Sequence, residues 1–184
     1  MRNWIFLLIL GGTLISCKEE VLPKPKAYLS LSYPTANYQK TKADKPYVFE
    51  ASTHAVLVEQ ANYWMEINYP NLKASIKITY RPVKNNLKEL LLESEKLVFK
   101  HTVKAEQIET QDFLEVKKRV FGTLHEIYGN AASQIQFHLT DSTTHFIKGA
   151  LYFYTKPNYD SILPAVHYIK KDIVRLMETL EWNS

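Results

Sequence analysis

The sequence has a single cysteine, Cys17, among its 184 residues. An intramolecular disulfide is therefore excluded, and the fold must be held together by its hydrophobic core alone. Glycine is scarce as well, with five residues in total, which are too few to build a glycine-rich phosphate-binding loop. The two deficits exclude a disulfide-stapled scaffold and a P-loop nucleotide site.

Long apolar runs and blocks of like charge are also missing. After residue 17, no apolar stretch approaches the roughly 20 residues that a transmembrane helix needs. The formal net charge is only +4, from 23 Lys and Arg against 19 Asp and Glu, with no run of five like charges. We expect no second membrane anchor and no nucleic-acid partner, because a basic nucleic-acid-binding patch requires clustered positive charge.

Catalytic and metal-binding motifs are not found either. The sequence contains no GxSxG and no HExxH, and its six histidines form no tight cluster with cysteine or aspartate. One local arrangement stays open: if the segments flanking Asp141–Thr144 pair as a hairpin, Thr140 faces His145 and His138 lies diagonally on the same face. The two histidines and Asp141 would then be close enough for a metal. We favour unligated histidines, and we predict no metal, no cofactor and no catalytic residue.

The first 17 residues, MRNWIFLLILGGTLISC, have the layout of an export signal. Arg2 supplies the positive charge, and Trp4–Leu10 form an apolar run that is too short to span a bilayer. The ending resembles a bacterial lipobox, in which the cysteine is acylated, typically with palmitate, and becomes the mature N-terminus. We predict a signal peptide over residues 1–16 and lipidation at Cys17; an ordinary secretory signal is the alternative.

Residues 17–27 are expected to form a lipid-anchored tether. Pro23 and Pro25 disfavour helix in their neighbours, so the segment is extended and spans about 30 Å. Glu19 and Glu20 are compatible with an acidic sorting signal for surface export, although a solvated linker is the interpretation that we prefer. Residues 28–184 are then predicted to form one globular domain.

Within this domain, short β-like runs alternate with turn residues. The segments 63–69 and 74–80 predict two strands joined by a Pro-Asn turn, with Ala74, Ile76 and Ile78 on one face. The expected strands cover residues 28–33, 47–50, 55–58, 63–69, 74–80, 120–128, 133–140 and 145–155.

Two segments show helical periodicity. Apolar residues recur at helical spacing over residues 87–98, and a longer apolar stripe runs from Ile162 to Leu180. Asp160 or Ser161 is the expected cap of the second helix, which places Pro164 in its first turn, where a missing N–H is tolerated.

Hairpin strands with two helices indicate an α+β fold: an antiparallel β-sheet covered by helices, with a long C-terminal helix. The order of the elements is similar to the Mog1/PsbP-like α/β/α sandwich. Such a sandwich would allow a ligand cleft between the sheet and the C-terminal helix. A lipid-anchored small-ligand carrier or chaperone is therefore the alternative function.

Tyrosine is abundant, with twelve residues, several of them clustered near positions 63–69 and 152–159. Tyrosine is favoured at protein interfaces because it combines apolar area with a polar tip. About half of these rings are needed for the core, since alternate strand residues face opposite sides. We predict partner binding at Tyr152, Tyr154, Asn158 and Tyr159.

Several phrases resemble the GldD gliding-motility lipoproteins of the Bacteroidetes. They are YLSLSYP at residues 28–34, ITYRPV at 78–83, GNAASQ at 129–134, the long block TDST to YFYTKPNYDS at 140–161, and METLEW at 177–182. The resemblance spans nearly the whole mature chain.

The resemblance implies an envelope lipoprotein required for gliding and associated with the type IX secretion machinery. It implies a non-enzymatic structural or assembly role, with other gliding and secretion envelope proteins as partners. The expected place is the outer membrane, facing the periplasm, with the N-terminal lipid as the membrane contact. Cys17 is the one residue whose role carries over from the family.

Overall fold

The computed structural model describes residues 32–101, 105–154 and 158–183. The predicted signal peptide, Cys17 and the tether lie outside these residues. The same is true of most of the expected strand at 28–33, whose described part, Ser32 and Tyr33, is not in a strand.

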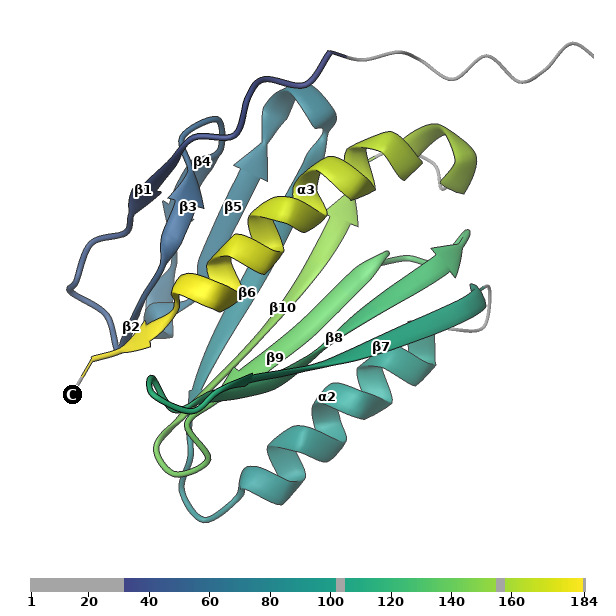
Figure 1. Cartoon of the computed structure of the whole chain (residues 1–184). Helices are drawn as coiled ribbons and strands as arrows, with labels where there is room; N and C mark the ends of the chain where they lie inside the picture. The colour runs from purple at the N-terminus through teal and green to yellow at the C-terminus, as the bar shows by residue number, and fades with distance from the viewer. Residues whose placement is uncertain (1–31, 102–104, 155–157, 184) are drawn as a thin grey trace, which may run out of the picture.

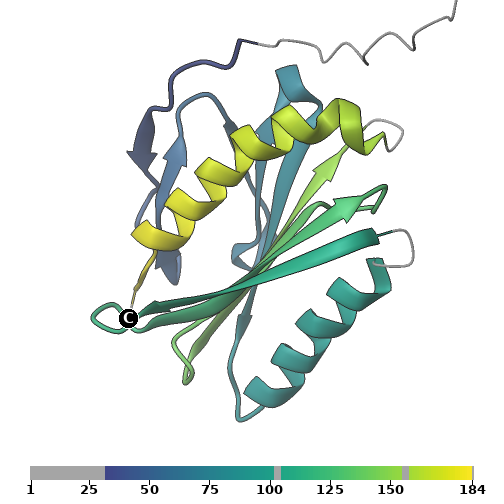
Figure 2. The same ribbon diagram turned by 45° about the vertical axis from the view of Figure 1, so that its right-hand side comes forward.

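A large antiparallel sheet of seven strands forms the centre of the described chain, in the order β4-β5-β6-β10-β9-β8-β7. Two α-helices of the described residues cover it from opposite sides, as Figures 1 and 2 show. The predicted α+β fold, with an antiparallel sheet and a long C-terminal helix, is thus confirmed. The elements are β4 (Val56–Glu59), β5 (Met65–Tyr69), β6 (Ala74–Pro82), α2 (Leu87–His101), β7 (Ala105–Glu115), β8 (Val120–Gly129), β9 (Ile135–Thr140), β10 (His145–Phe153) and α3 (Tyr159–Thr179).

Smaller elements close the edges of this sandwich. Two short antiparallel pairs lie beside α3: β1 (Tyr38–Lys40) with β3 (Glu50–Ser52), and β2 (Tyr47–Val48) with the C-terminal β11 (Glu181–Trp182). Two 3-10 turns, η1 (Ala61–Tyr63) and η2 (Pro70–Leu72), flank β5.

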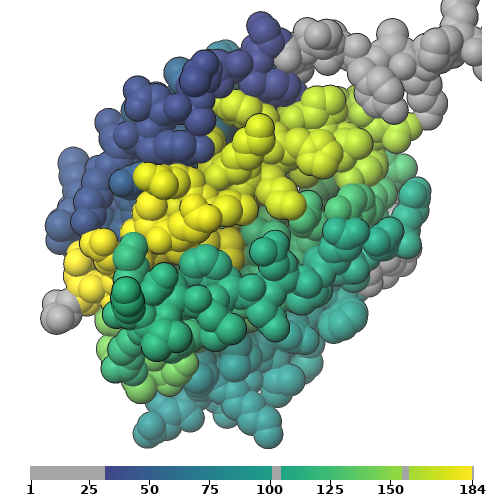
Figure 3. All heavy atoms as spheres, viewed as in Figure 1, coloured from purple at the N-terminus to yellow at the C-terminus, as the bar shows by residue number. Residues whose placement is uncertain are grey.

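The main core lies between the sheet and α3. Alternate residues of β6 point towards α3 and are buried, as the sequence predicts for Ala74, Ile76 and Ile78. The apolar stripe of α3 packs onto them, with Ile169 and Ile173 fully buried. In the space-filling view, α3 lies between the N-terminal strands and the green strands β7 and β8 (Figure 3).

The C-terminal helix, α3, begins earlier than predicted. Its N-cap is Asn158 and its first residue is Tyr159, so that Pro164 lies beyond the first turn, inside the helix. The predicted cap at Asp160 or Ser161 is therefore wrong. The strand β7 was not expected at all, whereas the hairpin of β5 and β6 is confirmed, with η2 and a left-handed Lys73 at its turn.

None of the helices described here combines the length and the apolarity that crossing a bilayer would require.

Candidate functional site

The face of the sheet opposite α3 is only partly covered. The helix α2 lies below β7 and β8, while β4 and β5 extend beyond it (Figures 1 and 2). The strand register places a set of side chains on this uncovered area, which we call the open face. Two of its members are exposed valines, Val56 at 54% and Val58 at 41%. The open face comprises Val56, Val58, Glu66, Asn68, Ser75, Lys77, Tyr152 and Tyr154.

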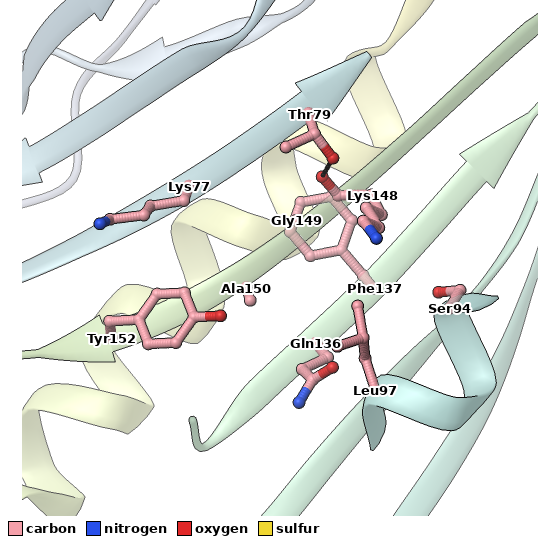
Figure 4. Close-up of a pocket in the computed structure, with 10 residues that line it drawn as sticks. All are labelled: Lys77, Thr79, Ser94, Leu97, Gln136, Phe137, Lys148, Gly149, Ala150 and Tyr152. Carbon is pink, nitrogen blue, oxygen red and sulfur yellow. Dashed lines mark hydrogen bonds between the residues drawn. The ribbon is translucent and has the colours of Figure 1, made fainter. Parts of the chain in front are cut away.

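A groove of about 290 Å³ runs where α2 meets this face. Strands β6, β9 and β10 supply its floor and α2 supplies one wall (Figure 4). The lining residues are Lys77, Thr79, Ser94, Leu97, Gln136, Phe137, Lys148, Gly149, Ala150 and Tyr152.

The charged groups in the groove are lysines. Lys148 Nζ lies 2.7 Å from Glu93 Oε1, outside the groove on α2, and Arg81 reaches the same carboxyl at 3.5 Å. The Lys148 hydrogen bond lowers the pKa of Glu93 below its ordinary value. Lys77 Nζ lies 5.7 Å from the centre of the Tyr152 ring, which is within cation–π range. Both charged side chains that line the groove are therefore positive, and one of them, Lys148, is paired with Glu93.

Beneath α2, the sheet holds buried polar residues beside a small apolar cluster that includes Val98 and Ile127. Gln136, His138 and His125 are exposed by only 7%, 5% and 7%. Gln136 Nε2, His138 Nδ1 and His125 Nε2 have no hydrogen-bond partner among the described residues. Burial lowers the pKa of His138 to about 4, helped by the nearby His125, so both rings are neutral near pH 7.

The predicted partner-binding residues fall into two groups. Tyr152 and Tyr154 lie on the open face, where the Tyr154 hydroxyl is 2.6 Å from both Ser75 Oγ and Glu66 Oε1. Asn158 and Tyr159 lie instead at the start of α3, where the Tyr159 N–H donates to an asparagine side chain, Asn130 Oδ1, at 2.9 Å. Partner binding at these four residues stays a prediction, and of the four only Tyr152 lines the groove.

The hairpin of β9 and β10 is closed by Asp141. Its Oδ1 accepts hydrogen bonds from the backbone N–H groups of Thr143, Thr144 and His145, at 3.0, 2.8 and 2.7 Å. These bonds outweigh the effect of burial and lower the pKa of Asp141 to about 2. The carboxylate therefore stabilises the turn.

This turn shifts the pairing by one residue from the predicted register. Thr140 pairs with Phe146, not with His145. His138 consequently lies on the α2 side, whereas His145 faces the other side, where it stacks on Trp182 at 5.2 Å. The hypothesis of a shared His138–His145 metal site is wrong. Within the described ranges, no three His, Cys, Asp or Glu side chains come together as a metal-binding group.

The interface beneath α3 differs from the cleft that a small-ligand carrier would use. Buried side chains fill it, and the buried Asp172 accepts hydrogen bonds from Tyr38 at 2.9 Å and Tyr69 at 2.8 Å. A hollow of about 190 Å³ lies only at its edge, between Tyr33 and Tyr168. The groove that the structure does show lies on the opposite face of the sheet.

The sequence did not single out Lys77, Lys148 and Gln136. The sequence does contain a signal for two of them. Lys148 interrupts an otherwise apolar and aromatic strand, and Gln136 is a polar residue between the apolar residues Ile135 and Phe137. Their convergence depends on strand order, which periodicity does not reveal.

Comparison with known families gives one match that covers nearly the whole chain. The model of the family described as gliding motility lipoprotein GldD matches residues 18–182. The comparison with curated proteins found no match. A match of this extent shows the family, and with it a lipid-anchored place in the cell envelope and a part in gliding motility. The resemblance seen in the sequence is confirmed: the chain belongs to the GldD family of gliding motility lipoproteins.

Proposed function

We propose that this protein is a non-enzymatic assembly component of the gliding motility machinery and of the type IX secretion system associated with it. In this role it docks other envelope proteins onto the open face of its sheet. The observation that carries the proposal is this uncovered face, because the opposite face is sealed by α3 and buries its apolar residues.

The exposed chemistry of the open face suits protein binding. Contiguous exposed apolar residues beside aromatic and charged groups are typical of interaction surfaces. Val56 and Val58 project from β4, which is the first strand of the sheet and has β5 as its one neighbour in the described residues. Tyr154, exposed by 58%, continues the surface towards the end of β10.

A docking role also agrees with the contacts of the buried ionisable groups. Asp141 holds a turn, and Asp172 accepts two tyrosine hydroxyls inside the α3 interface. His138 is kept neutral by burial beneath α2. Each of these groups has a structural contact that accounts for it, which favours a binding protein over an enzyme.

Lipidation of Cys17 would give this domain its place in the envelope. The tether at residues 17–27 would hold the domain about 30 Å from the membrane surface. We propose the outer membrane as that membrane, with the domain facing the periplasm, since partners of the motility and secretion apparatus are expected there.

A matched pair of surface variants tests the docking role. Val56→Glu with Val58→Glu changes two exposed valines on the open face. Leu114→Glu with Val116→Glu changes two still more exposed apolar residues, at 72% and 73%, near the turn between β7 and β8.

We expect the first double variant to abolish colony spreading and to lose the envelope proteins that co-purify after mild crosslinking. The second should retain both, and both variants should accumulate normally. A Cys17→Ala variant separates anchoring from docking: it should retain partner binding in detergent extracts but lose spreading. Normal spreading and secretion in a clean deletion strain would overturn the proposal as a whole.

A further inference from the structure

The groove beside α2 has an uneven distribution of charge. Two of its ten lining residues are lysines, and none of those described is acidic. Lys148 is partly neutralised by Glu93 on α2. Lys77 is exposed and its ammonium group is held near the Tyr152 ring, where no described carboxylate forms a salt bridge with it. Its cross-strand neighbour Glu66 acts on it through space, but that carboxylate accepts its hydrogen bond from the Tyr154 hydroxyl. An exposed ammonium group without a direct salt bridge at the mouth of the groove favours an anionic occupant.

A second and independent feature points to an acceptor group in the occupant. Gln136 lines the groove and is more than nine-tenths buried, and its Nε2 lacks a hydrogen-bond partner among the described residues. A buried donor without a partner costs free energy, typically equivalent to a tenfold change or more in an equilibrium constant. An occupant with carboxylate oxygens would satisfy Gln136 and Lys77 together.

The position of the groove favours a protein side chain, because the groove lies between α2 and the uncovered part of the sheet. It also continues into the open face through Lys77 and Tyr152, which belong to both surfaces (Figure 4). A segment bound on the open face can therefore place one side chain in the groove.

We propose that the groove receives an aspartate or glutamate side chain from a segment of a partner protein that lies over the open face. Lys77 pairs with the carboxylate at the mouth, and Gln136 donates to it from the floor. Leu97 and Tyr152 contact the apolar part of the same segment. This inference deepens the proposed function, and it can fail while that function stands, if partners dock on the open face without using the groove.

Site-directed photocrosslinking in cells tests the inference with the full lipidated chain. Leu97, half-buried on the wall of the groove, is replaced by p-benzoylphenylalanine. The same replacement at Leu92, exposed elsewhere on α2, is the matched control. Mass spectrometry of the adduct then identifies the crosslinked segment.

Lys77→Gln removes the charge without placing a second carboxylate opposite Glu66, its cross-strand neighbour. Lys88→Gln, on an exposed lysine of α2 outside the groove, is its control. We expect the Leu97 adduct to contain an Asp or Glu within two residues of the crosslink. Its yield should fall roughly tenfold in Lys77→Gln, remain unchanged in Lys88→Gln, and recover in Lys77→Arg.

A double-mutant cycle completes the test. Changing the acidic residue of the captured segment to its amide should lower the yield as much as Lys77→Gln does, and combining the two changes should add little more. The inference would be overturned by additive losses, by a segment without an acidic residue, or by a lipid adduct. A Leu97 yield no higher than that at Leu92 would do the same, even if the open-face variants still lost their partners.

Discussion

The two faces of the sheet are packed in opposite ways. Towards α3, the strands present aliphatic and aromatic side chains that are almost fully buried, including Ile76, Phe137 and Leu151. Towards α2, the same strands present glutamine, histidine, threonine and lysine beside a smaller set of apolar residues such as Phe146 and Ile127, and part of the face stays uncovered. The α3 face therefore holds the larger apolar core. The α2 face combines a smaller one with polar groups that can serve binding.

The largest test of this comparison is the same truncation on each helix. Leu176→Ala on α3 removes a side chain buried in the main core, and we expect a loss of about 3 kcal/mol in the free energy of unfolding. Leu97→Ala on α2 removes a half-buried side chain beside a groove, and we expect about 1 kcal/mol. Urea denaturation of both variants measures the difference. Equal losses would show that the two layers stabilise the sheet equally.

Substitutions at two neighbouring residues of β10 compare the packing on the two faces of the sheet. A Cβ atom on Gly149 would lie 2.2 Å from the Cζ atom of the buried Phe137 ring. Gly149→Ala should therefore cost about 2 to 3 kcal/mol through overpacking. Ala150→Val points into the groove and should change stability by no more than about 0.5 kcal/mol. Thermal unfolding distinguishes the two variants. A well-tolerated Gly149→Ala would mean that the core beneath α3 has room for an added methyl group.

The α2 face should also make stability depend on pH. The pKa of His138 is lowered by burial from 6.5 to about 4. An unfolded chain therefore binds more protons than the folded one between these values, and stability falls as pH drops from about 6.5 to 4. The shift allows a loss of up to roughly 3 kcal/mol from this residue. His125 on the same face, and His145 on the opposite one, have pKa values lowered in the same direction and add to the loss.

Substitution of His138 by leucine separates this effect from acid unfolding of carboxylates. His138→Leu should flatten the decline between pH 6.5 and 4, measured by urea denaturation at each pH. Carboxylates with lowered pKa values, such as Asp141 at about 2, lose their contribution only below about pH 4. An unchanged slope in the variant would assign the pH dependence to other groups.

Sequence periodicity predicted the elements that bury one clear face. The stripe of α3 and the alternation in β6 were visible because their apolar residues follow one period. β7 was missed because its eleven residues, AEQIETQDFLE, are mostly polar and exposed. An edge strand of this kind draws its structure from hydrogen bonds to β8 and not from burial.

The predicted register of β9 was wrong for a related reason. All six residues of β9 are buried, so its pattern does not show which parity faces the main core. The choice is made by the Asp141 turn, whose hydrogen bonds set the pairing of Thr140 with Phe146. The groove was equally invisible, because its residues come from β6, α2, β9 and β10 and meet only in the folded chain.

The smallest expected effect concerns the hydrogen bonds that the Tyr154 hydroxyl forms on the open face. Tyr154→Phe removes the hydroxyl that contacts buried Ser75 and donates to Glu66, and should cost no more than about 1 kcal/mol. This hydrogen bond is the largest cause of the lowered pKa of Glu66, so the pKa should rise towards 4.5 in the variant. Carbon-13 NMR titration of the glutamate carboxyl groups measures the change, and Tyr159→Phe at the start of α3 should leave it unaltered. If the pKa of Glu66 stays low in Tyr154→Phe, Ser75 and Lys77 are sufficient to stabilise the carboxylate, and the lysine is then less available to an incoming acidic side chain.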